Sequence, residues 1–275
     1  MDKNNLINRI VIVGAAIAAF LLVVAIVLLV MPDDPSPEAD PPETEETMTP
    51  NPWDAEGFYM QDGFLHYTDA PYQIGIDVST HQGLIDWQAV ADAGVEFAII
   101  RAGYRGSTEG LLYEDEQFRY NLERAKAVGL QVGVYFFSQA VNAEEALEEA
   151  EFLCELLDGE VLDLPVFYDW EETGSDSRTG AYHSFPLTDF ARTFCRAVTE
   201  NGYAAGVYFN QNFGYHYFDL RELKAYTLWL AEYNIPPTFS YAFDCLQYTD
   251  SGTVAGIEVP VDLNLLFLPD EQPSP

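Results

Sequence analysis

The sequence predicts an α/β protein whose main domain is a TIM-like barrel. Along residues 72–268, short runs of β-branched and aromatic residues alternate with amphipathic helical patterns. Such alternation indicates parallel strands joined by right-handed crossovers, and eight strand candidates are enough to close a barrel. An open doubly wound sheet is the alternative. Since no G-x-G-x-x-G segment follows the first strand and no Walker loop is present, a nucleotide-binding sheet has little support.

The expected strands form a group of five, separated by helices, and a closely spaced group of three. The first group is 73–79, 96–102, 131–138, 164–171 and 204–210. The second group is 227–233, 244–249 and 259–265. Helices are expected at 86–93, 114–128, 142–157, 187–201 and, as one short piece, 219–225. The first four end at or near a glycine, a common helix terminator. The second half of the barrel should therefore be irregular.

The N-terminal part predicts a membrane anchor. Residues 10–31 contain no charged residue and can cross a ~30 Å hydrocarbon core as a helix. A cleaved signal peptide is the alternative, but its apolar region is usually only ~7–15 residues long. Residues 1–9 carry Lys3 and Arg9, whereas the next basic residue is Arg101. The excess of positive charge before the span places residues 1–9 in the cytoplasm and the rest of the chain outside the cell.

Two segments join this span to the barrel domain, which covers residues 72–268. Residues 32–52 are rich in proline and acid and poor in large apolar side chains, so we expect a disordered stalk. Residues 53–71 regain aromatic residues around a Gln-Asp-Gly turn signal, which predicts a β-hairpin at the domain edge. A mobile lead-in is the alternative. Residues 269–275 are a short tail.

Composition excludes several kinds of partner. The formal net charge is -33, and only 12 Lys and Arg are spread over the chain, so no basic patch for nucleic acid is expected. The histidines and cysteines lack metal-ligand spacing, and we expect neither a metal nor a cofactor. Cys154 and Cys195 fall on neighbouring helices and could pair, but buried free thiols, including Cys245, are the alternative.

Acidic residues near the strand ends are the candidates for catalysis, because reactive groups of β/α-barrels project from those ends. Asp77 lies near the end of the first expected strand, Asp169 and Glu171 close the fourth, and Asp262 lies in the eighth. Asp169 and Glu171 are two residues apart in a strand, so they point the same way. Carboxylates in one cleft raise one another's pKa, so one stays protonated as a general acid for glycosidic cleavage must. Solvated loop acids are the alternative.

Aromatic residues accompany these acids. Sugar rings stack on aromatic faces, so an acidic cleft lined by aromatic residues would suit a polysaccharide. Core packing is the alternative for each of them. The candidates are Tyr104, Tyr135, Phe137, Tyr168, Trp170, Tyr208, Trp229 and Tyr233.

Several ordered motifs resemble the glycoside hydrolase family 25 lysozymes, the Chalaropsis-type muramidases. The motifs are I-G-I-D-V-S-T-H-Q-G-L-I-D-W from residue 74, F-A-I-I-R-A-G, V-G-V-Y-F-F, P-V-F-Y-D-W-E, G-V-Y-F, L-W-L-A-E-Y, L-Q-Y-T and V-D-L-N. The resemblance covers about residues 72–268. It implies a (β/α)5(β)3 barrel that hydrolyses the β-1,4 bond between N-acetylmuramic acid and N-acetylglucosamine in peptidoglycan.

The resemblance also implies roles for individual residues. Glu171 matches the proton donor and Asp169 its partner acid, while Asp77 and Asp262 match two further acidic positions. The segments that would line the substrate groove contain Arg101, Tyr135, Tyr208, Trp229, Tyr233 and Gln247.

Two positions depart from the family pattern. Leu246 stands where such enzymes commonly carry Trp, and Val259 replaces a usual Gly. We expect the first to weaken sugar stacking and the second to reshape a loop. The expected partners are peptidoglycan glycan strands and, through residues 10–31, the cytoplasmic membrane, and we expect a monomer. A catalytically silent peptidoglycan-binding tether and a hydrolase of another polysaccharide are the alternatives.

Overall fold

A computed structural model describes residues 47–180 and 182–268. The expected cytoplasmic tail, membrane span, most of the stalk and the C-terminal tail therefore lie outside the described residues. Within the described residues, no helix is both long enough and apolar enough to cross a membrane.

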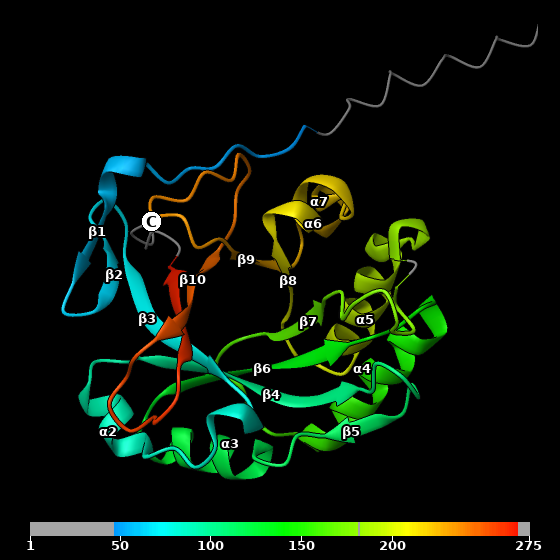
Figure 1. The fold of residues 1–275 in the computed structure, drawn as a ribbon, viewed down its shortest axis with the longest axis horizontal. Coiled ribbons are helices and arrows are strands. Elements are labelled where there is room, and N and C mark those ends of the chain that lie inside the picture. The colour runs from blue at the N-terminus through cyan, green and yellow to red at the C-terminus, as the bar shows by residue number, and fades with distance from the viewer. Residues whose placement is uncertain (1–46, 181, 269–275) are drawn as a thin grey trace, which may run out of the picture. The chain divides into compact units, whose positions relative to one another are not determined.

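Eight strands close into a barrel, which confirms the predicted fold (Figure 1). Closure occurs where the last strand, β11, pairs with β3, which also pairs with β4. The strands, in their order around the barrel, are β3 (Tyr72–Val78), β4 (Phe97–Arg105), β6 (Gln131–Ser138), β7 (Val166–Trp170), β8 (Ala205–Asn210), β9 (Thr227–Ala231), β10 (Cys245–Gly252) and β11 (Val261–Phe267).

Helices follow the first strands as the sequence pattern predicts. The longest, α4 (Ala143–Leu157) and α5 (Leu187–Glu200), pack against each other. Asn142 caps α4 by accepting a hydrogen bond from the Glu145 N–H at 2.9 Å. The remaining helices are α2 (Trp87–Asp92), α3 (Phe118–Ala127), α6 (Gln211–His216) and α7 (Leu220–Leu223), with single 3-10 turns η1 (Ala55–Gly57), η2 (Thr80–Gln82) and η3 (Tyr182–Ser184).

Two features of the sheet differ from the sequence prediction. A short strand, β5 (Leu112–Glu114), pairs antiparallel with β4, and α3 begins after it rather than at residue 114. The last strand, β11, runs antiparallel to both of its neighbours, whereas β10 is parallel to β9. A pattern of strand-like residues carries no information on strand direction. The antiparallel direction brings the start of β11, rather than its end, to the barrel mouth.

The barrel has an inner and an outer apolar core. Successive strand residues point to opposite faces, so residues two apart share one of these cores. Inside the barrel, the Phe97 ring packs against Gly75, where a Cβ would lie only 2.3 Å from the ring. The Phe167 ring excludes a Cβ at Gly206 in the same way. The inner core contains Phe97, Ile99, Phe167, Tyr208, Trp229, Ala231, Cys245 and Leu266. The outer core lies between the strands and the surrounding helices.

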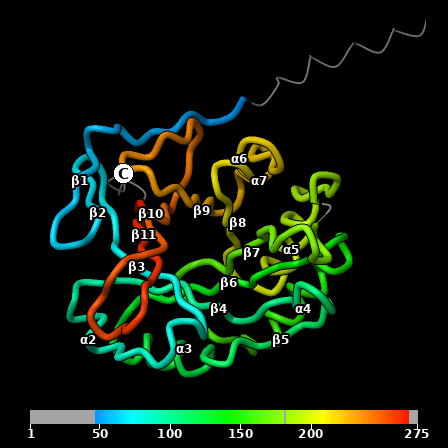
Figure 2. The backbone as a smooth tube through the Cα atoms, in the orientation of Figure 1, coloured from blue at the N-terminus to red at the C-terminus, as the bar shows by residue number. Residues whose placement is uncertain are grey.

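An N-terminal hairpin covers part of the barrel beside the late strands. Its strands β1 (Phe58–Gln61) and β2 (Phe64–Tyr67) pair antiparallel, and β2 contacts both β3 and β11 (Figure 2). Ahead of the hairpin, the Trp53 ring stacks on Phe267 at 3.8 Å between ring centroids, and its Nε1 donates to the Phe243 carbonyl at 3.0 Å. These contacts supply apolar cover on a side where no long helix lies between the strands.

We expect Trp53→Ala to lower the free energy of unfolding by about 2–3 kcal/mol. Replacement of a fully buried Trp by Ala lowers the free energy of unfolding by ~3–5 kcal/mol. The loss should be smaller here because Trp53 is only partly buried. Urea denaturation of both chains measures the difference. Tyr59→Ala, on the exposed face of the hairpin that follows Trp53, is the control and should change stability by no more than ~0.5 kcal/mol. Equal effects of the two substitutions would mean that the segment is a mobile lead-in.

All three cysteines are free thiols, so Cys154 and Cys195 do not pair. Burial raises the pKa of the Cys154 thiol to about 11 and raises that of Cys195 still further. Cys195 and Cys245 are fully buried, the latter inside the barrel. Their thiols therefore pack as small apolar groups.

Candidate active site

The barrel mouth brings together the four acids that the sequence singled out. Asp77 and Asp262 lie directly opposite each other on the paired strands β3 and β11. Asp169 lies in β7, and Glu171 follows one residue after this strand ends. Asp262 reaches the mouth because the antiparallel β11 begins there.

Asp169 and Glu171 form a hydrogen-bonded carboxyl pair. Asp169 is only 5% exposed, and its Oδ1 has no hydrogen-bond partner among the described residues, whereas Glu171 is half-buried. Burial is the largest cause that raises the pKa of each group, and nearby carboxylates add to it. The hydrogen bond between them raises the pKa of Asp169 and lowers that of Glu171. The two raised pKa values suit a pair of carboxyls that shares one proton.

Asp77 is held by two amide side chains. Gln247 Nε2 and Asn264 Nδ2 donate to its Oδ2 at 2.9 and 2.8 Å. Burial, with a smaller contribution from the charge of Glu171, raises the pKa of Asp77 to about 6, although the two amide donors oppose the shift. Burial, with the charge of Asp77, also raises the pKa of Asp262 to about 8. The pKa values of these two carboxyls therefore lie well above the usual range for aspartate.

Further donors fix the orientation of these amides. Tyr208 and Tyr233 hydroxyls each donate to Gln247 Oε1 at 3.1 Å, so the Gln247 amide nitrogen must face Asp77. The Trp229 indole donates to Asn264 Oδ1 at 2.8 Å. Asn264 was not among the residues expected at the site, although it lies two residues after Asp262 on the same strand. This spacing of two residues places both side chains on one face of the strand and could have identified Asn264 as a site residue.

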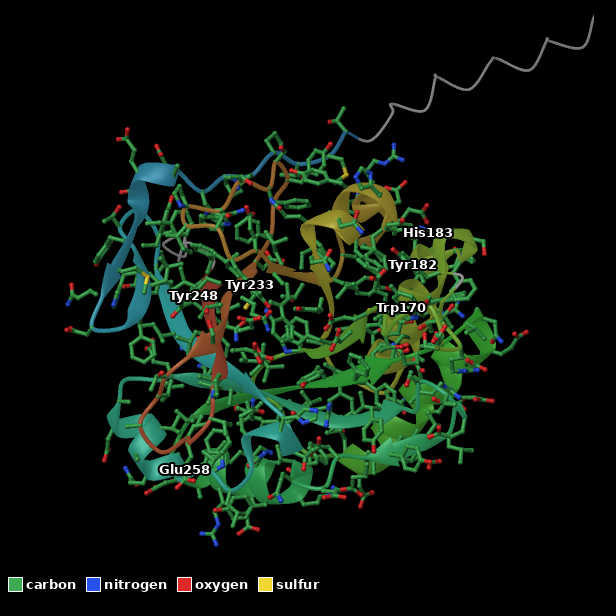
Figure 3. The ribbon with its side chains drawn as sticks, viewed as in Figure 1. Trp170, Tyr182, His183, Tyr233, Tyr248 and Glu258 are labelled. Carbon is green, nitrogen blue, oxygen red and sulfur yellow. The ribbon has the colours of Figure 1, made fainter. Side chains whose placement is uncertain are left out.

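The other expected groove residues divide into exposed and buried ones. Tyr233 is 51% exposed, and Figure 3 shows it well apart from Trp170 and Tyr182. Trp229 is only 1% exposed and packs inside the barrel, so it positions Asn264 and offers no free ring face. Trp170 is equally buried, and its indole donates to the Ala140 carbonyl at 2.9 Å. Tyr168 is also fully buried in the outer core.

Arg101 lies on β4, the strand that pairs with the Asp77 strand β3. Its Nε and Nη2 contact Asp115 Oδ2 at 2.8 and 2.7 Å, and its guanidinium lies over the Tyr104 ring. Tyr135 is half-buried; burial raises the pKa of its hydroxyl, and the charge of Arg101 opposes that shift. Arg101 therefore carries its positive charge close to the carboxyl cluster without an ion pair to it.

One hollow is bordered by Glu171 itself, and a second is bordered by Arg101 and Thr173. One, of about 370 Å³, is lined by Glu171, Tyr208, Asn210, Gln211, Asn212, Ala231, Glu232, Tyr233 and Asn234. The other, of about 460 Å³, is lined by Thr80, His81, Arg101, Tyr104, Arg105, Gly106, Ser107, Glu109, Glu116, Phe137 and Thr173. Glu171 borders the first, and Thr173, two residues later, borders the second.

The departure at Leu246 does not affect the groove. Leu246 is fully buried in the outer core, because its neighbour Gln247 is the one that faces the barrel interior. The expectation that it weakens sugar stacking is therefore wrong. Val259 is 42% exposed in the connection before β11.

The raised pKa values predict that stability falls as the pH rises from about 4 to about 8. A carboxyl whose pKa is higher in the folded chain than in the unfolded chain stabilises the fold when it is protonated. This contribution is complete below the unfolded pKa of ~4 and is lost as the pH rises to the folded pKa. The values are about 6 for Asp77 and about 8 for Asp262. Away from the mouth, Glu149 of α4 is fully buried beside Arg105, and burial raises its pKa to about 7. Urea denaturation at several pH values measures the slope. Asp262→Asn should flatten it above pH ~6, and an unchanged slope would contradict the assignment.

Comparison with known proteins identifies relatives of this chain. The sequence profile of the glycosyl hydrolases family 25 matches residues 76–257. An autolytic lysozyme of Clostridium acetobutylicum is 32% identical over 193 residues, which cover 69% of this chain and 54% of that protein. An uncharacterized protein of Escherichia coli K12, YegX, is 31% identical over 224 residues, covering 76% of this chain and 75% of its own length. The chain thus spans about half the length of the autolytic lysozyme.

Solved structures share the fold. The modular autolysin LytC of Streptococcus pneumoniae, solved in complex with a synthetic peptidoglycan ligand, superposes with a TM-score of 0.61 at 25% identity, covering 76% of this chain and 52% of that chain. A family 25 glycosyl hydrolase from Bacillus anthracis superposes with a TM-score of 0.58 at 22% identity, covering 75% and 94%. The second likeness concerns the fold alone.

Proposed function

This chain belongs to glycosyl hydrolase family 25, and we propose that it is a lysozyme of the Chalaropsis type that hydrolyses peptidoglycan. The bond cleaved is the β-1,4 linkage between N-acetylmuramic acid and N-acetylglucosamine. Lysozyme and autolysin relatives support this reaction. The observation that carries the proposal is the hydrogen-bonded pair of Asp169 and Glu171 at the groove, with Asp77 and Asp262 beside it.

In the proposed mechanism, Glu171 protonates the leaving glycosidic oxygen. Glu171 is the member of the pair that borders a hollow, whereas Asp169 is almost fully buried. The proton held on Asp169 moves along their hydrogen bond to Glu171 when substrate displaces water from the groove. The Asp169 carboxylate left behind stabilises the positive charge that develops on the sugar, directly or by orienting the 2-acetamido group of the substrate.

The groove geometry favours a glycan substrate over a compact one. Tyr233 offers an exposed ring on one side of Glu171, and several amide side chains line the same hollow. Rings stack on the C–H faces of sugars, and amides pair with hydroxyl and acetamido groups. Because the domain is acidic and the bacterial wall is anionic, these short-range contacts must supply the affinity.

Digestion of purified peptidoglycan by the full chain tests the proposal. We expect new reducing ends at N-acetylmuramic acid, which mass spectrometry after borohydride reduction identifies. Reducing ends at N-acetylglucosamine would exclude a muramidase. Binding to peptidoglycan without any cleavage would identify a silent tether, and cleavage of chitin but not of peptidoglycan would identify a hydrolase of another polysaccharide.

We further propose that the chain is a single-pass membrane protein with its N-terminus in the cytoplasm. The support is the uncharged stretch 10–31 with Lys3 and Arg9 before it. The catalytic domain would then face the wall as a monomer at the end of the stalk. Protease added to intact cells should remove the domain if this orientation is correct, and protection of the domain would contradict it.

A further inference from the structure

Glu171 lies just outside the regular part of the sheet. The ladder between β6 and β7 ends at Trp170, and residues 171–180 form neither helix nor strand. A catalytic group at the start of an irregular segment needs a separate restraint, because a misplacement of about 1 Å can cost ~10²-fold in rate.

The side chain of Gln139 supplies such a restraint. Gln139 follows the end of the neighbouring strand β6 and is fully buried. Its Nε2 donates to the Glu171 carbonyl at 2.7 Å and to the Ser138 carbonyl at 2.8 Å. Its Oε1 accepts from the hydroxyls of Thr173 and Thr179 at 2.7 and 2.9 Å. All four hydrogen-bonding positions of the amide are therefore occupied.

The backbone of Gln139 is itself held in place. Its carbonyl accepts from Arg178 Nη1 at 2.9 Å, and Arg178 contacts both carboxylate oxygens of Glu145 in α4 at 2.7 and 2.6 Å. The Gln139 N–H donates to Glu149, also in α4, at 3.4 Å. The residue whose amide binds the Glu171 carbonyl is thus fixed to both a barrel strand and an outer helix.

We propose that Gln139 is a positioning residue for Glu171. By holding the Glu171 carbonyl, it keeps the Glu171 carboxyl beside Asp169 and at the edge of the groove. Gln139 is buried beneath the segment that follows β7, so it acts through Glu171 and not on the substrate. This inference rests on the proposed hydrolase function.

Gln139→Glu tests the role because it keeps the size of the side chain and changes its donors. The new carboxylate can still accept from Thr173 and Thr179, but when ionised it cannot donate to the Glu171 carbonyl and repels it. When protonated it regains one donor. At neutral pH we expect kcat to fall about 10- to 100-fold with KM within about twofold, and to recover partly as the pH is lowered. Unfolding measured at each pH separates lost turnover from lost folded protein.

Thr179→Val is the matched control. It removes one hydrogen bond to the same amide but leaves the bond from Nε2 to Glu171 intact, and Thr179 is fully buried. We expect a lower Tm with kcat within about threefold of the wild type. Folded Gln139→Glu with wild-type kcat at neutral pH would overturn the proposal, as would a loss of kcat in Thr179→Val equal to that in Gln139→Glu.

Crystal structures of the wild type and Gln139→Glu at neutral pH give a readout that does not depend on activity. We expect the Glu171 carboxyl to move away from Asp169 in the variant. If the wild type releases no reducing ends from peptidoglycan, the proposed function fails, yet the position of Glu171 still decides the role of Gln139. An unmoved Glu171 would overturn that role.

Discussion

Glu171→Gln is expected to lower kcat on peptidoglycan about 10³-fold while leaving binding within about threefold. General acid catalysis contributes ~10²–10⁴-fold, and an amide cannot deliver the proton that the leaving oxygen requires. The Gln side chain can still hydrogen-bond to Asp169, so the groove should keep its shape. Release of reducing ends measures turnover, and co-sedimentation with insoluble peptidoglycan measures binding.

Glu172→Gln is the control for this substitution. The same change is made one residue later, at an exposed side chain that lines neither hollow. We expect kcat within about twofold of the wild type. If Glu171→Gln retained near wild-type turnover, Glu171 would not be the acid, whatever the behaviour of the control.

Asp169→Asn is expected to lower kcat about 10²- to 10³-fold and to move the pH optimum downward. The substitution removes the charge that stabilises the developing positive charge on the sugar. It also places an N–H donor beside Glu171 at every pH, which favours ionised Glu171 and lowers its pKa. The acid form of Glu171 then persists only at lower pH. The dependence of kcat on pH measures both effects.

The double variant Asp169→Asn/Glu171→Gln tests whether the two carboxyls work as one unit. Groups that share a proton and a single step lose activity in a non-additive way. We expect the double variant to be no more than about threefold slower than Glu171→Gln alone. If the loss of kcat in the double variant equalled the product of the losses in the two single variants, Asp169 and Glu171 would act in independent steps. That result would contradict the shared-proton mechanism.

Local sequence patterns were enough to predict most of the fold. The strand prediction at 131–138 matches β6, and the helix predictions at 142–157 and 187–201 match α4 and α5 to within one residue at each end. Each depends on a local period of apolar residues and on a cap or a terminating glycine, which the chain carries within a few residues. Short β5 escaped prediction because its three residues show no such period.

The sequence by itself determined which residues are the candidates for catalysis. Asp169 and Glu171 share a face because they lie two apart at the end of a strand, and the motifs around Asp77 and Asp262 identified the remaining acids. The tertiary structure alone decided how they are supported. Contacts between distant segments determine the direction of β11 and the inward orientation of Asn264 and Gln247. They also determine the burial of Trp229 and the hydrogen bond from Gln139 to Glu171. When both faces of a strand are buried, alternation shows which residues share a face but not which face lines the barrel.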